Sequence, residues 1–473
     1  MISKSKNNFF NFSDSTNLTA IIKSDASISY RDLFTKSNII AHSLFSAGIN
    51  RNNYVPLLIE DQYSFIEVVL AIWKLGAIPV PINTKMIEDE ISTLIDDHNF
   101  KFLVTDKSIQ FANHKHDLKI SILSQLELNQ IDIDQSPKPN LNLNAEAVVI
   151  FTSGSTGKPK GVVHTFSSII NSVENGNKIL MHQQKDRWLA SLPFYHIGGF
   201  QIICRSLFYG CSIIIPESFQ TNDLIESIKS YNPTYLSLVS TQLERLIDKK
   251  AKPCECLKRS LIGGGFIDDE LIYKADELGW KPFRVYGSSE TASFVTAISS
   301  KEIKSKPQSI GKSFSNVKIK ITAESEILIK SNSIFNKYLN DDKETSIKLI
   351  EGFYHTGDLG FVDDQGYLFI EARRTDLIVT GGENVNPIEV EKTLKLISGI
   401  KDACVFAKID KTWGQIVVAA VVKSELSLNE KSIKENLKQK LAGYKIPKKI
   451  YFTENLPHTS LGKLERETIA KMF

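Results

Sequence analysis

Hydrophobic and polar residues alternate in two patterns over the first 290 residues. Apolar positions recur three and four residues apart over 33–45 and 65–75, which is typical of amphipathic helices. Short apolar runs at 77–82, 102–104 and 147–151 are typical of buried strands. Because helices alternate with strands, we expect an α/β fold with doubly wound, mostly parallel sheets.

The pattern changes near residue 317. From there to residue 371 the apolar runs are shorter, and the Asp-Asp-Gln-Gly turn at 363–366 favours a β-hairpin. A new alternation begins after Arg374 and ends in a lysine-rich segment with two prolines. We therefore expect a large N-terminal domain, residues 1–372, which contains a small β subdomain over about 317–371. A small α+β C-terminal domain, residues 373–473, would follow it.

The composition excludes several classes of protein. With 42% hydrophobic and 23% charged residues, the chain is unlike disordered, collagen-like or coiled-coil proteins. Its formal net charge of +3 gives no general electrostatic reason for binding nucleic acid or a membrane surface. We therefore expect a globular protein whose partners are chosen by local sites.

The number and spacing of the cysteines and the hydropathy of the chain indicate the cellular compartment of the protein. The five cysteines lack the spacing of a disulfide framework, and Cys254 and Cys256 have no second pair that would complete a metal site. Lys74 interrupts the stretch that comes nearest to a membrane span. Residues 1–17 lack the apolar core of a signal peptide. We expect a soluble protein of the reducing cytoplasm.

A segment rich in glycine, hydroxyl and lysine side chains, TSGSTGKPKG at 152–161, follows the apolar run 147–151. Its glycines allow a ligand to approach the backbone, and its hydroxyls and lysines are donors that suit a polyphosphate. It is not a Walker A loop, because only two residues separate Gly154 from Gly157 and Pro159 follows the lysine. A flexible loop without a ligand is the alternative. The candidate phosphate-binding residues are Thr152, Ser153, Gly154, Ser155, Thr156, Gly157 and Lys160.

Further candidate residues follow later in the chain. Residues 286–291, YGSSET, come after the apolar run 283–285, and a glutamate beside hydroxyls there is suited to holding Mg²⁺ against phosphate oxygens. A helix-capping cluster is the alternative.

Asp358 follows a glycine and can accept two ribose hydroxyls, and Arg373 lies fifteen residues further on. An aspartate in a turn is often structural, which is the alternative. Lys463 carries no information by itself.

Together and in this order, the motifs resemble those of the adenylate-forming superfamily, which includes acyl-CoA ligases, adenylation domains and beetle luciferases. TSGSTGKPKG is similar to the phosphate loop of that superfamily, YGSSET to its adenine and magnesium motif, and YHTGDLG to its ribose motif. ARRTDLIVTGGENVNPIEVE resembles its hinge and the beginning of its C-terminal domain, and LPHTSLGKLER carries its catalytic lysine. The resemblance extends over about residues 20–470.

The resemblance implies an enzyme that runs two half-reactions. A carboxylate attacks the α-phosphorus of Mg·ATP and gives an acyl-adenylate and pyrophosphate. The thiol of coenzyme A then displaces AMP and forms a thioester. ATP, Mg²⁺ and coenzyme A are therefore the expected cofactor and co-substrates. The small C-terminal domain of the superfamily is mobile and rotates between the two steps.

The motif matches also imply roles for single residues. Lys463 would bridge the reacting carboxylate and the α-phosphate, Glu290 would hold Mg²⁺, and Thr291 would hold the α-phosphate. Thr375 stands at the hinge, where the superfamily usually has Asp or Lys, and residues 381–384 would line the path of the pantetheine. The remaining nucleotide-binding residues implied, along the ribose, the adenine and the edge of the acyl pocket, are Tyr286, Gly287, Asp358, Arg373, Gly263, Gly264 and Gly265.

Several stretches look closest to one branch of the superfamily, the o-succinylbenzoate–CoA ligases of menaquinone and phylloquinone biosynthesis. These stretches are 188–196, 238–246 and 261–265. The acid of that branch is a dicarboxylate, of which one carboxylate reacts and the other must be held.

Arg205 is the candidate for holding the second carboxylate. It lies in the apolar run 199–208, nine residues after His196, and a buried guanidinium needs an anionic partner. An arginine that reaches solvent or pairs with an internal acid is the alternative. His196 would gate the acyl pocket, unless it is structural, and Ser288 would contact the acid. Gly198 and the pair Ser288-Ser289 depart from the residues usual in this branch, which leaves the identity of the acid open.

Three alternatives remain at the level of sequence. A generic aryl- or fatty-acyl-CoA ligase shares every motif. An adenylation domain that loads a carrier protein usually has an early aspartate for an amino group, and residues 194–200 contain none. A pseudoenzyme that only binds nucleotide has no need of Lys463, Glu290 and Asp358, which are all present. The expected partners are small molecules, and the oligomeric state stays open, a homodimer included.

Overall fold

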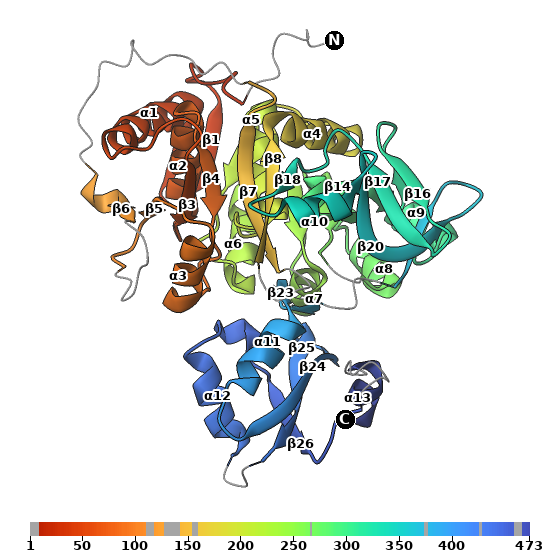
Figure 1. Ribbon diagram of the computed structural model, residues 1–473. Coiled ribbons are helices and arrows are strands. Elements are labelled where there is room, and N and C mark those ends of the chain that lie inside the picture. The colour runs from red at the N-terminus through yellow and green to blue at the C-terminus, as the bar shows by residue number, and fades with distance from the viewer. Residues whose placement is uncertain are drawn as a thin grey trace.

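The chain forms a large N-terminal part, which extends to residue 372, and a small C-terminal part, which begins at residue 377. The C-terminal part lies below the N-terminal part in Figure 1. The computed structural model describes residues 9–109, 118–126, 142–153, 159–264, 267–372, 377–424, 428–457 and 466–473.

A nine-stranded sheet organises the middle of the N-terminal part. Its six central strands, from β13 to β1, run parallel, and β2, β14 and β15 add antiparallel edges. This is the doubly wound α/β arrangement that the hydrophobic pattern predicted. In spatial order the strands are β15 (Lys312–Ser313), β14 (Ser293–Ser299), β13 (Pro282–Ser288), β12 (Arg259–Ile262), β11 (Tyr235–Leu238), β9 (Arg187–Leu189), β10 (Ser212–Ile214), β1 (Thr19–Lys23) and β2 (Ala26–Ser29).

Two further sheets lie beside it. One is a four-stranded parallel sheet, and the other is a three-stranded antiparallel sheet. The apolar run 147–151 belongs to the second of these, not to a parallel sheet, because β7 pairs along its whole length with the next strand, β8. The strands are β4 (Ile78–Pro81), β3 (Tyr54–Leu58), β5 (Phe102–Thr105) and β6 (Lys119–Ile122), and then β18 (Lys337–Tyr338), β8 (Pro159–Thr165) and β7 (Glu146–Ser153).

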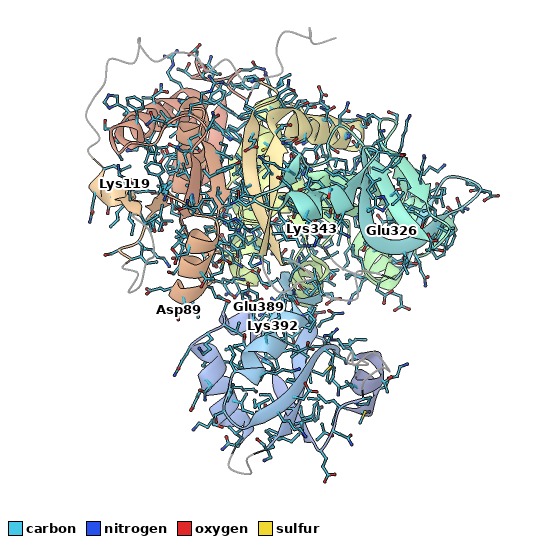
Figure 2. All side chains as sticks on the ribbon, viewed as in Figure 1. Asp89, Lys119, Glu326, Lys343, Glu389 and Lys392 are labelled. Atoms are coloured by element: carbon cyan, nitrogen blue, oxygen red, sulfur yellow. The ribbon has the colours of Figure 1, made fainter. Side chains whose placement is uncertain are left out.

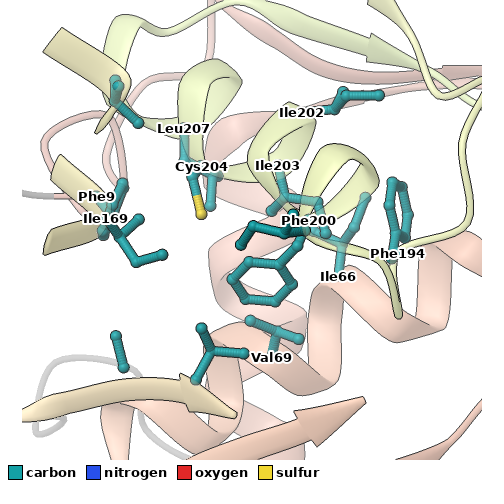
Figure 3. Close-up of a cluster of buried hydrophobic side chains, with 14 of the residues drawn as sticks. Phe9, Ile66, Val69, Ile169, Phe194, Phe200, Ile202, Ile203, Cys204 and Leu207 are labelled. Atoms are coloured by element: carbon teal, nitrogen blue, oxygen red, sulfur yellow. The ribbon is translucent and has the colours of Figure 1, made fainter. Parts of the chain in front are cut away.

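Helices pack between and around these sheets. The largest apolar core lies where α2, α4 and α5 meet, and Figure 3 shows Phe194 and Phe200 beside Ile66 and Val69 in it. Burial of so many large side chains makes these helices a rigid support for the loops at their ends. The helices are α1 (Tyr30–Ser46), α2 (Gln62–Lys74), α3 (Glu88–Asp97), α4 (Phe166–Leu180), α5 (Ile197–Tyr209), α6 (Thr221–Tyr231), α7 (Ser240–Asp248), α8 (Asp269–Glu277), α9 (Ser300–Ser305) and α10 (Asp342–Lys348).

A small antiparallel sheet follows in the region expected to be β-rich. Its strands are β16 (Lys318–Ile321), β17 (Glu326–Lys330), β20 (Phe353–Val362), β19 (Leu349–Ile350) and β21 (Leu368–Ala372). The Asp-Asp-Gln-Gly segment at 363–366 joins β20 to β21, which pair antiparallel.

The C-terminal part is a five-stranded sheet with helices on both faces. Residues of α11 and α12 pack on one face, and residues of α13 pack on the other. The strands are β23 (Glu383–Val385), β22 (Ile378–Thr380), β25 (Gly414–Lys423), β24 (Ile400–Asp410) and β26 (Lys449–Thr453), and the helices are α11 (Pro387–Lys395), α12 (Glu430–Lys438) and α13 (Arg466–Met472). The expected domain boundary at 372/373 adjoins residues 373–376, outside the described ranges, and stays a prediction.

Among the described residues, no helix is both long and apolar enough to cross a membrane.

Candidate active site

The predicted motifs converge beside the end of β13. Tyr286 lies on this strand, Glu290 on the short 3₁₀ helix η3 (Ser289–Thr291) that follows it, and Asp358 on β20. The Tyr286 hydroxyl donates to Asp358 Oδ2 at 2.6 Å, so segments 72 residues apart meet here. Burial of Tyr286, reinforced by Asp358, raises the pKa of its hydroxyl well above the usual value and keeps it a donor.

Glu290 is a buried carboxylate, with 3% of its surface exposed. Its Oε1 accepts a hydrogen bond from the Tyr338 hydroxyl at 2.9 Å, and its backbone carbonyl accepts one from the Phe335 amide at 2.8 Å. His164 supports the same turn, since its Nε2 lies 2.7 Å from the Ser289 carbonyl oxygen. A carboxylate fixed in this way presents hard oxygen atoms of the kind that Mg²⁺ prefers.

The residues present fit a magnesium ion that is shared with phosphates. No group of three or more potential metal ligands from His, Cys, Asp and Glu occurs within the described ranges. Mg²⁺ typically binds one or two carboxylates together with substrate phosphates and water, and one fixed carboxylate is what Glu290 offers.

Lys160 lies at the other side of this network. Its Nζ is 2.6 Å from Glu344 Oε1, and the ammonium also lies over the Tyr338 ring at 5.6 Å from the centroid. Both charged groups are largely shielded from water, with 13% and 20% of their side chains exposed. The cation of the segment predicted to bind phosphates is therefore held in place by Glu344.

The YGSSET turn, residues 286–291, also contains capping contacts, which were predicted as the alternative to a magnesium site. The Ser288 amide donates to Thr291 Oγ1 at 2.8 Å, and Thr291 is 1% exposed, with its hydroxyl bonded within the turn. The Ser288 hydroxyl is buried and has no described partner. Gly263 adjoins the same strand, because a Cβ there would meet Val285 at 2.9 Å. The α-phosphate role of Thr291 stays a prediction.

Arg205 lies in the interior, with 1% of its surface exposed. Its Nη2 donates to Ser293 Oγ at 3.0 Å, and the guanidinium lies 5.0 Å from the Phe294 ring centroid and 5.4 Å from that of Trp188. Within the described ranges no Asp or Glu forms an ion pair with Arg205, and its Nε has no hydrogen-bond partner. Burial lowers the pKa of Arg205 to about 10, so the group is still charged at neutral pH.

His196 and Tyr195 meet a residue of the C-terminal part. Glu383 Oε2 lies 3.2 Å from His196 Nε2, and Glu383 Oε1 lies 3.2 Å from the Tyr195 hydroxyl and 2.7 Å from Lys85 Nζ. Burial acts to raise the pKa of Glu383, but His196 and Lys85 outweigh it and hold the pKa at about 2. A carboxylate from the C-terminal part thus fixes the histidine that was expected to gate the acyl pocket.

Several predicted residues lie outside the described residues. Sequence reasoning also missed partners that the fold supplies from far along the chain, namely Lys85, Tyr195, His164, Tyr338 and Glu344. The predicted residues whose placement or side chain is not described are Ser153, Gly154, Ser155, Thr156, Gly157, Gly265, Arg373, Thr375 and Lys463.

Comparison with known proteins fits this geometry. The AMP-binding enzyme family matches residues 11–339, and the AMP-binding enzyme C-terminal domain matches residues 389–463. The chain belongs to the AMP-binding enzyme family. Both segments of this family lie in the expected order along the chain.

Two similar relatives are 2-succinylbenzoate–CoA ligases. The chain is 30% identical to the 2-succinylbenzoate–CoA ligase of Bacillus subtilis over 463 residues, which cover 95% of this chain and 94% of that protein. It is 32% identical to the 2-succinylbenzoate–CoA ligase of Staphylococcus epidermidis over 468 residues, covering 96% and 94%.

Two solved structures of the o-succinylbenzoate CoA synthetase of Bacillus subtilis are also similar, and each comparison covers 98% of both chains. A double mutant bound with its product analogue OSB-NCoA has a TM-score of 0.92 at 28% identity. The complex with the acyl-adenylate intermediate OSB-AMP has a TM-score of 0.75 at 29% identity. Because one enzyme gives both values, this chain has an arrangement closer to that of the product-analogue complex.

Proposed function

We propose that this protein joins o-succinylbenzoate to coenzyme A, with ATP as the energy source and an acyl-adenylate as intermediate, in menaquinone or phylloquinone biosynthesis. AMP and pyrophosphate would be the other products. Family membership and the similarity of nearly the whole chain to 2-succinylbenzoate–CoA ligases support the reaction. A cytoplasmic location belongs to the same proposal, because all five cysteines lie in described segments and are free.

The buried Arg205 is the observation that supports a dicarboxylic acid as the substrate. A guanidinium in an apolar interior is costly unless an anion pairs with it, and the described residues supply none. The far carboxylate of a dicarboxylic acid would provide that anion to a guanidinium that Phe294 and Trp188 already hold in place. A monocarboxylic acid would leave the buried charge unpaired.

In the first half-reaction the protein must hold a crowded, highly charged phosphate group. Lys160 and the hydroxyls of the 152–161 segment would bind the β- and γ-phosphates, and Glu290 would hold Mg²⁺, which neutralises phosphate charge when bound. Asp358 would accept the ribose hydroxyls, oriented by Tyr286. Lys463 would stabilise the charge that develops where the carboxylate meets the α-phosphate.

In the second half-reaction the sulfur of coenzyme A attacks the acyl carbon, and the bond from that carbon to the AMP oxygen breaks. Glu383 would hold His196 and Tyr195 aside from the path of the thiol, and residues 381–384 would line this path. The high TM-score with the product-analogue complex supports this assignment of the present arrangement.

The experiment that tests the role of Arg205 compares two acids in one variant. Arg205→Ala should raise KM for o-succinylbenzoate roughly ten- to hundred-fold, the value of a hydrogen bond to a charged group. The KM for benzoate should change less than about threefold. A Ser293→Ala variant is the control, because it removes the described partner of Arg205 but leaves the charge. Equal effects of Arg205→Ala on the two acids would remove Arg205 from the acyl pocket.

A further inference from the structure

A buried lysine joins the N-terminal part to the C-terminal part. Lys445 ends the 3₁₀ helix η4 (Gly443–Lys445), and its Nζ lies 2.8 Å from Glu90 Oε1 and 2.8 Å from Glu389 Oε1. Glu90 belongs to α3 of the N-terminal part, 355 residues away, whereas Glu389 belongs to α11 of the C-terminal part. In Figure 2 Glu389 lies at the edge of the C-terminal part that faces the N-terminal part, and Asp89, the neighbour of Glu90, lies at the lower end of α3.

The three charges are screened from water. The side chains of Lys445, Glu90 and Glu389 are 8%, 10% and 21% exposed. Burial disfavours the ammonium, but Glu389 and Glu90 outweigh it and raise the pKa of Lys445 above its usual value. Burial raises the pKa of Glu389, and Lys445 opposes this. Removal of one partner from a buried ion pair leaves an uncompensated charge, which is strongly destabilising.

The contact between Lys445 and Glu90 exists only while the two parts adopt this arrangement. Glu389 stays beside Lys445 whatever the orientation of the C-terminal part, because both belong to it, whereas Glu90 does not. Removal of Glu90 therefore weakens this arrangement without touching the internal Lys445–Glu389 pair.

We propose that Glu90 and Lys445 form an ionic latch that stabilises the arrangement in which coenzyme A attacks the acyl-adenylate. Both are positioning residues, because neither is placed among the atoms that react. The inference rests on the proposed function for its kinetic consequence, but the latch itself is a property of the two parts of the chain.

Glu90→Gln is the variant that isolates the charge. Glu90 Oε2 also accepts a hydrogen bond from the Ile87 amide at 3.2 Å and so caps α3, and a glutamine oxygen can keep that bond. Glu88→Gln is the matched control, because Glu88 is an exposed glutamate in the same turn of α3. Lys445→Arg keeps the charge, and Lys445→Met removes it.

The kinetic arm measures the half-reactions separately. Pyrophosphate release without coenzyme A should stay within twofold of the unaltered protein in Glu90→Gln and Lys445→Met. Thioester formation from preformed acyl-adenylate should slow at least fivefold in both, and at most twofold in Lys445→Arg and Glu88→Gln. Equal slowing of both half-reactions, or of neither, would overturn the latch.

The structural arm does not depend on the acid. Spin labels at the exposed positions His42 on α1 and Glu435 on α12, with Cys254 and Cys256 replaced by serine, report the distance between the two parts. Glu90→Gln should lower the fraction of molecules whose label-to-label distance is that of the present arrangement. Glu88→Gln should leave this fraction unchanged. An unchanged distribution in Glu90→Gln would contradict the latch, whereas absence of turnover with a shifted distribution would contradict only the proposed function.

Discussion

At the scale of single residues, this protein places charged groups in its interior where the proposed reaction requires them. Arg205 is buried against aromatic rings, Glu290 is fixed by Tyr338, and Glu383 is held in its charged form by His196 and Lys85. Each such group loses hydration and needs a partner, either from the protein or from a ligand. For Arg205 the proposed partner is the substrate.

A buried histidine, His164, and a half-buried one, His182, predict how the free energy of unfolding depends on pH. Burial lowers the pKa of His164 to about 4 and that of His182 to about 3, against about 6.5 in an unfolded chain. The unfolded state therefore binds more protons below pH 6.5, so the free energy of unfolding should fall as the pH drops from 6.5 to 5. Each histidine contributes up to about 1.4 kcal/mol per pH unit.

Urea unfolding at pH 7, 6 and 5 measures this dependence, and His182→Phe is the informative variant. Phenylalanine can keep the stacking with Tyr209 and Trp188 but cannot titrate. Glu67, whose pKa burial raises to about 7, acts in the opposite direction in both proteins, so the slope should be less steep in the variant by up to about 1.4 kcal/mol per pH unit. The same slope in both proteins would show that His182 does not contribute.

At the scale of elements, short strands and helices bring residues from distant segments to one place. Helix α5 illustrates this, because His196 caps its beginning and Arg205 lies two turns further on. The helix begins close to the preceding loop, and a Cβ at Gly199 would lie 2.1 Å from the Pro193 carbonyl oxygen. A side chain at Gly199 cannot be accommodated without movement of the backbone.

Gly199→Ala should therefore be strongly destabilising, by at least about 2 kcal/mol, and should displace His196. Gly198→Ala is the control, because its Cβ would meet only the flexible end of Leu192, at 3.2 Å. Thermal unfolding and thioester formation should both suffer in Gly199→Ala and remain near normal in Gly198→Ala. Equal melting temperatures of the two variants would contradict this account of the helix start.

The elements and the site were not equally predictable from the sequence. The run 147–151 was predicted as a strand from its apolar residues, but not its antiparallel pairing with β8, because a run buried on both faces does not indicate its neighbours. Glu290 and Asp358 stood out through local motifs. Glu344 and Lys85 did not stand out, because only the fold brings them to their partners. Glu344 is 184 residues from Lys160, and Lys85 is 298 residues from Glu383.

At the scale of the whole molecule, the arrangement of the two parts connects the site to the proposed cycle. Glu383 reaches His196, and Lys445 reaches Glu90, only because the C-terminal part lies against the N-terminal part as it does here. Three predictions are still to be tested at this scale: the domain boundary near 372, the uncharged hinge residue Thr375 and the catalytic role of Lys463.

We propose that this protein is a CoA ligase for a dicarboxylic aryl acid. The most direct measurement is ATP-dependent formation of CoA thioesters with o-succinylbenzoate, 4-coumarate, benzoate, octanoate and palmitate, each compared by kcat/KM. We expect kcat/KM to be much higher for o-succinylbenzoate than for the other acids, with one AMP and one pyrophosphate released per thioester. Preference for any of the four monoacids, or pyrophosphate exchange with amino acids alone, would contradict it.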